Sequence, residues 1–188
     1  MTSTDLSLKL TETMLSYFGG EKIEALVFIL PIGLLSLVFG AWLMTDDGGA
    51  FARGVAIPFV LMGVLMSTVG AVVGYRTPGQ LRELTAAIHD SPATAQATRR
   101  DEGVRMARVN RAWNFYLVGW AALGIIGLLL RFVTKDDLLQ GLGIAMVFFC
   151  GVGLLVDGFA ERRARSYATV LVATLDVTPA MNTPRKES

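Results

Sequence analysis

The sequence has few of the residues from which metal, haem and disulfide sites are built. Among its 188 residues there is one cysteine, Cys150, and one histidine, His89, and only 18% of the residues are charged. A single cysteine excludes an intrachain disulfide. A single histidine excludes a bis-histidine haem and a zinc site that needs several histidines. We therefore predict no metal and no cofactor.

Recognisable enzyme motifs are also missing. No nucleophile elbow, phosphate-binding loop or dinucleotide fingerprint stands in a suitable context. The sequence thus offers no catalytic residue, and we expect a protein that is not an enzyme. The formal net charge of +1 gives no reason to expect binding to nucleic acid.

Apolar residues, by contrast, are abundant. They make up 53% of the chain, and the mean hydropathy is +0.52. Four runs without any charge, 25–45, 54–75, 112–130 and 138–156, are each close to the 20 or so residues that a membrane-spanning helix needs. The predicted fold class is an all-α membrane protein, with a four-transmembrane-helix bundle made of two hairpins in contact with the lipid bilayer.

The remaining segments complete the expected organisation. Leu6, Leu10, Met14 and Tyr17 share one helical face, which predicts an amphipathic helix lying on the membrane surface. Within the basic loop, Ser91 and Pro92 predict a helix start, and Asp101 is placed to pair with Arg105. The expected segments are an interfacial helix 1–22, hairpins 23–75 and 112–160, a basic helical loop 76–111, an amphipathic helix 161–178 and a disordered tail 179–188.

The distribution of basic residues predicts the orientation. Four spans place both termini and the loop 76–111 on one side, and that side carries 14 of the 17 lysines and arginines. By the positive-inside rule, both termini are cytoplasmic in a bacterial-type inner membrane. Aromatic residues expected at the membrane interfaces are Trp42, Tyr75, Trp113, Tyr116 and Phe132.

The two predicted hairpins resemble one another. Each has an acidic tight turn, and Gly54 and Ile57 match Gly141 and Ile144 at a common offset. An internal duplication explains this pattern. The general likeness of any two membrane hairpins explains it as well, so both interpretations remain open.

Small residues indicate how the spans pack. Within a membrane, helices approach closely where glycine removes the side chain. Such contacts serve the bundle itself or a homo-oligomer. The candidate packing positions are Gly33, Gly40, Gly63, Gly70, Gly74, Gly151 and Gly158.

Charge near the spans occurs only at their ends. Asp157, which follows the uncharged run 138–156, is either a carboxylate that gates or recognises a ligand, or one member of an interfacial ion pair. We favour the ion pair, because charges at span ends reach the interface at little cost. The candidate interaction or ion-pair residues are Glu24, Arg76, Arg111, Asp157 and Arg162.

These features favour a protein that acts by binding a membrane protein partner. Accessory subunits, assembly factors and immunity proteins against membrane-targeting toxins belong to this class. The alternative is a small channel or transporter formed by oligomerised, duplicated hairpins. Ionisable groups near the middle of the membrane would favour that alternative, and the four uncharged runs contain none.

Overall fold

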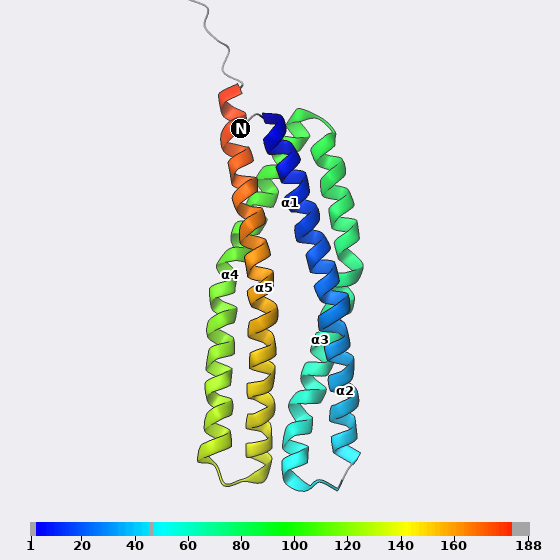
Figure 1. Ribbon diagram of the computed structural model, residues 1–188, viewed down its shortest axis with the longest axis vertical. Helices are drawn as coiled ribbons and strands as arrows, with labels where there is room; N and C mark the ends of the chain where they lie inside the picture. The colour runs from blue at the N-terminus through cyan, green and yellow to red at the C-terminus, as the bar shows by residue number, and fades with distance from the viewer. Residues whose placement is uncertain (1–2, 46, 182–188) are drawn as a thin grey trace, which may run out of the picture.

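The computed structural model describes residues 3–45 and 47–181 as four long helical rods (Figure 1). The first rod joins α1 (Ser3–Ile23), a π-helix η1 (Glu24–Ile29) and α2 (Leu30–Thr45) without a break. The other rods are α3 (Gly49–His89), α4 (Pro92–Val133) and α5 (Asp137–Met181). The predicted disordered tail begins inside α5, which continues to Met181, and the rest of that tail lies outside the described residues.

Each rod is about twice as long as a membrane is thick. A helix of 41 to 45 residues measures about 60 Å, whereas the hydrocarbon core of a bilayer measures about 30 Å. All four rods contain a stretch long and apolar enough to cross a membrane. The structure therefore supports a multi-pass helical membrane protein in which every span continues into a helical extension.

The most completely buried large side chains lie in these extensions and not between the spans. Leu10, Met14 and Phe18 of α1 pack with Met106 of α4 and with Tyr167 of α5, and each is at most 1% exposed. We call this cluster the extension core. Because water surrounds a segment beyond the membrane, burial of these apolar groups stabilises the extension strongly.

The extension core shows how the N-terminal segment packs. The apolar face predicted to lie on the membrane surface packs against other helices of the same chain. An amphipathic pattern specifies only that one face is covered, and a bundle satisfies it as well as a membrane surface does. For the same reason, the segment 161–178 continues the fourth span as part of α5 and buries Tyr167 and Leu171.

The basic loop is a helical hairpin. α3 runs to His89, and α4 begins at Pro92 after a two-residue turn. The backbone N–H of Thr94 donates to Ser91 Oγ at 3.2 Å, which confirms the predicted cap with proline at the first helical position.

Glycines bring the spans together at most of the expected positions. A methyl group added at Gly33 would lie 2.4 Å from Ser67 N, and one added at Gly70 would lie 2.7 Å from Leu30 N. Gly40, Gly63 and Gly74 have similarly close neighbours across the contact between the first rod and α3. Among the described residues, Gly151 and Gly158 have no neighbour within 4 Å, so they do not serve packing within the chain, and a role in a homo-oligomer stays a prediction.

The close contacts repeat at a constant offset of 87 residues. Gly54 faces the backbone of Leu138, and its equivalent Gly141 faces the backbone of Phe51, the equivalent of Leu138. Gly40 packs on Phe59 and Val60 of α3; its equivalent Gly127 packs on Met146 and Val147, which are their equivalents on α5. The two hairpins therefore pack at matching positions and meet through a nearly symmetric contact. This favours duplication over a general likeness of hairpins.

Along the described spans, the first rod and α5 are neighbours of α3 but make no extensive contact with each other. α2 packs along α3, α3 packs along α5, and α5 packs along α4. Figure 1 shows the resulting arrangement, with α2 and α3 on one side and α4 and α5 on the other. Over the described residues, α2 makes no extensive contact with α5. A groove remains between α5 and the part of the first rod from the end of α1 through η1 to the start of α2.

Candidate functional site

The groove lies between the first rod and α5, and we call it the hairpin groove. It has a volume of about 570 Å³. Its lining is apolar except at one end, where Glu24 and Arg163 stand. Its apolar walls include Ile23, Phe28, Ile32, Val152, Leu155 and Phe159.

The π-helix η1 shapes one wall of the groove. Pro31 has no N–H to donate, and in an α-helix its ring would also clash with the carbonyl of Val27. The chain winds more widely just before this proline, and the N–H of Leu30 donates to the oxygen of Ala25, five residues back. Such π-helical turns often occur at functional sites. Here the turn carries Glu24 and Phe28, which both line the groove.

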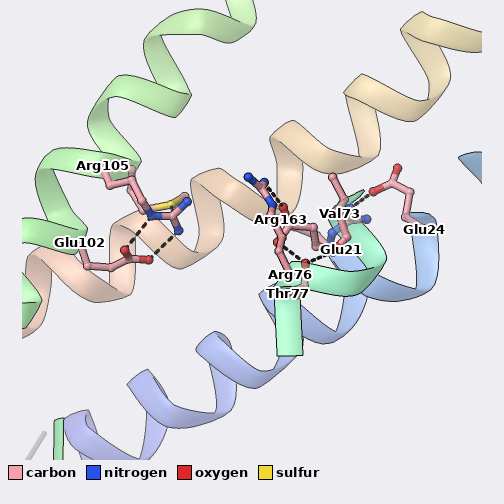
Figure 2. A network of polar contacts seen from close by, with 9 residues as sticks. Glu21, Glu24, Val73, Arg76, Thr77, Glu102, Arg105 and Arg163 are labelled. Carbon is pink, nitrogen blue, oxygen red and sulfur yellow. Dashed lines mark hydrogen bonds and ion pairs between the residues drawn. The ribbon is translucent and has the colours of Figure 1, made fainter. Parts of the chain in front are cut away.

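An ion pair closes the charged end of the groove. Arg163 of α5 donates to the carboxylate of Glu24, as Figure 2 shows. Both side chains are mostly buried, with exposed fractions of 27% and 12%. A Cβ at position 20 would lie 2.7 Å from Cδ of Arg163, so Gly20 leaves the room in which the arginine passes α1.

A second ion pair ties α1 to α3 close by. Arg76 lies 3.5 Å from the carboxylate of Glu21, and the hydroxyl of Thr77 donates to Val73 O at 2.7 Å and lies 3.5 Å from Glu21 Oε2 (Figure 2). Thr77 is only 1% exposed. Arg76 is half exposed, so this pair contributes little free energy but holds the two rods in one register.

Asp157 belongs to a second, smaller cavity of about 140 Å³. Its carboxylate accepts a hydrogen bond of 2.7 Å from the indole N–H of Trp120. Within the described part of the chain Asp157 forms no ion pair, so the expected pairing is corrected. In the first hairpin, the positions equivalent to Asp157 and Trp120 at the 87-residue offset are Gly70 and Gly33. This polar contact thus departs from the repeat.

Two other candidate residues do not join the site. Arg162 is exposed, because one residue along a helix turns a side chain by about 100°, and Arg163 is the arginine that faces Glu24. Arg111 is also exposed and has no ion pair over the residues that the structure covers. Among the described residues, no three histidine, cysteine, aspartate or glutamate side chains lie close enough together to hold a metal ion.

The sequence did not indicate a buried ion pair inside the extension core. Arg105 donates two hydrogen bonds of 2.7 Å to Glu102, whose side chain is 6% exposed (Figure 2). The expected partner, Asp101, is exposed instead. Glu102 is on the helix face toward the core, and the guanidinium group of Arg105 also lies 5.9 Å from the ring of Phe18. In the sequence, this pair is indicated only by the spacing, with Glu102 three residues before Arg105.

Two tyrosines flank this pair. The rings of Tyr17 and Tyr167 stack with centroids 5.0 Å apart. Burial raises the pKa of both hydroxyl groups above the ordinary value; nearby Glu21 adds to the rise at Tyr17 and Glu102 adds to it at Tyr167. Hydrogen bonds from Arg105 to Glu102 raise the pKa of the guanidinium group. The cluster therefore holds neutral phenols around one strongly held ion pair.

Comparison of the chain with protein-family models, with curated proteins and with solved structures finds no match. The role of the site is therefore argued from its own geometry.

Proposed function

We propose that this protein works by binding another component of the membrane in the hairpin groove and that it does not catalyse a reaction. The observation that carries the proposal is the groove itself. It offers about 570 Å³, which is within the usual range for ligand sites, and it has apolar walls with a few polar groups at one end. An accessory subunit, an assembly factor or an immunity protein would use such a site.

Site-specific photocrosslinking in intact membranes tests this proposal. A photoreactive phenylalanine analogue replaces Phe28 or Phe159, which line the groove from opposite sides. The matched control replaces Phe115, an exposed phenylalanine of α4 outside the groove. We expect a defined crosslinked species from both groove positions and only general lipid labelling from the control. The same products from all three positions would contradict the proposal.

The alternative function is a channel or transporter formed by oligomers. The cavity beside Asp157 and the matched packing of the two hairpins support it. Flux of ions into liposomes that contain the purified protein would favour this alternative, particularly if Asp157→Asn abolished the flux while insertion was unchanged.

We further propose that the membrane is a bacterial-type inner membrane and that both termini are cytoplasmic. The 14-to-3 distribution of basic residues supports this orientation. The charged end of the hairpin groove would then lie at the cytoplasmic interface.

A further inference from the structure

The dimensions of the hairpin groove limit what it can bind. Its lining runs from Gly20 to Ile32 on one wall and from Val152 to Arg163 on the other, about 17 Å at 1.5 Å per residue. One leaflet of a bilayer contributes about 15 Å of hydrocarbon. The groove therefore extends through one leaflet and not through the whole membrane.

The lining of the groove suits a hydrocarbon chain. Eight of its ten lining residues are apolar or glycine, and the two charged ones, Glu24 and Arg163, pair with each other at one end. A hydrocarbon chain carries no polar group, so dispersion contacts with such walls suffice to hold it.

The groove is also open to lipid along its side. Leu155 and Phe159 line it and remain 66% and 61% exposed. On the opposite wall, Ile23 and Phe28 are more than half exposed. A lipid can therefore enter laterally from the bilayer, without a movement of the helices.

Basic residues surround the charged end. Three carboxylates occur in the segments 20–24 and 159–165, and each has an arginine: Arg76 with Glu21, Arg163 with Glu24, and Arg165 with Glu161. Lys22 and Arg162 are exposed and form no ion pair among the described residues. These three acids are each paired with an arginine, and a fourth carboxylate at this level, Asp157, accepts a hydrogen bond from Trp120. Counting Asp157 against Lys22 and Arg162 leaves one net positive charge where the uncharged runs end.

We propose that the hairpin groove binds one anionic phospholipid, with an acyl chain along the apolar walls and the headgroup phosphate just beyond the charged end, near the exposed Lys22 and Arg162, which neighbour Glu24 and Arg163 in the chain but do not line the groove. This inference rests on the proposed function and names the membrane component that the groove takes. Arginine and lysine bind phosphate through charge-assisted hydrogen bonds.

Native mass spectrometry of the full chain in mild detergent tests the inference. Phosphatidylglycerol is titrated against phosphatidylcholine with the same acyl chains. We expect one phosphatidylglycerol per chain to be retained, with an affinity at least about tenfold higher than that of phosphatidylcholine. Equal retention of the two lipids would overturn the inference.

Two variants probe the walls and the charged end separately. Leu155→Trp fills the groove and should lower retention about tenfold or more, whereas Val118→Trp, on the exposed surface of α4, should leave it unchanged. Arg162→Gln combined with Lys22→Gln leaves all three ion pairs intact and should remove the preference for phosphatidylglycerol. Arg100→Gln combined with Arg108→Gln, two exposed arginines of α4, is the matched control. Unchanged retention in both groove variants would refute the inference.

Competition with inorganic phosphate distinguishes binding of the headgroup from binding of the acyl chain. We expect millimolar phosphate to leave the lipid bound, because the acyl chain supplies most of the apolar contact. Displacement of the lipid by phosphate alone would overturn the assignment to a phospholipid. If a protein crosslinks at Phe28 and Phe159 while phosphatidylglycerol is not retained, the inference fails and the proposed function stands. If neither a protein nor phosphatidylglycerol binds above the controls, the inference and the proposed function both fail.

Discussion

At the scale of single residues, the Glu102–Arg105 pair tests how the extension is held together. Arg105→Gln leaves the carboxylate of Glu102 buried without its charged partner. We expect a loss of about 2–3 kcal/mol in unfolding free energy, the usual contribution of hydrogen bonds between charged groups. Thermal unfolding in detergent measures this loss. Arg108→Gln, which changes an exposed arginine one turn away, is the control and should be close to neutral.

The contact between Asp157 and Trp120 yields a second prediction. In Asp157→Asn, the amide oxygen still accepts the indole N–H, so the variant should insert normally and lose little stability. Trp120→Phe removes the donor from the carboxylate and should cost about 1–3 kcal/mol. Thermal unfolding of the two variants checks the order. A larger loss in Asp157→Asn would show that its charge, and not this hydrogen bond, matters.

The raised pKa of Tyr167 predicts a dependence on alkaline pH. The folded protein disfavours the phenolate, so above the unfolded value of about 10 the unfolded state loses protons that the folded state retains. Stability should therefore fall as the pH rises from about 9 to 11. Tyr167→Phe has no phenol to ionise, and its unfolding temperature should decline less over this range. Parallel curves for the two proteins would contradict the explanation.

At the scale of helices, the glycine contacts divide the structure into tight and open surfaces. Gly70 faces the backbone of Leu30 at 2.7 Å, whereas Gly151 has open space around it and Val72 is 54% exposed. Gly70→Ile should therefore destabilise the bundle by about 1–3 kcal/mol or more through overpacking. Val72→Ile and Gly151→Ile should be nearly neutral. Unfolding in detergent compares the three, and equal losses would contradict this assignment.

At the scale of the whole molecule, the proposed orientation is testable with reporter fusions. Alkaline phosphatase fused after residue 49 should be active, because that turn lies on the side with few basic residues. Fusions after residues 100 and 188 should be inactive. Activity at either of these two positions would reverse the topology and place the charged end of the hairpin groove outside the cytoplasm.

Elements that depend on local chemistry could be predicted from the residues alone. Four uncharged runs predicted four apolar helices, because a backbone in lipid must satisfy its hydrogen bonds within the helix. Ser91 and Pro92 predicted the start of α4 through the geometry of a cap. Most of the packing glycines were also predicted, since close approach in a membrane requires small residues.

Which helix faces meet depends on the packing of distant segments. The amphipathic pattern of α1 is the same whether lipid or protein covers its apolar face. In the structure, Met106 of α4 and Tyr167 of α5 pack against that face. Arg162 and Arg163 are adjacent and have the same side chain, so the sequence does not show which of them pairs. The turn of the helix directs Arg163, and not Arg162, toward Glu24. The hairpin groove exists because, over the described residues, η1 and the start of α2 pack on α3 without extensive contact with α5. Such a gap between distant segments is a property of packing that no local pattern records.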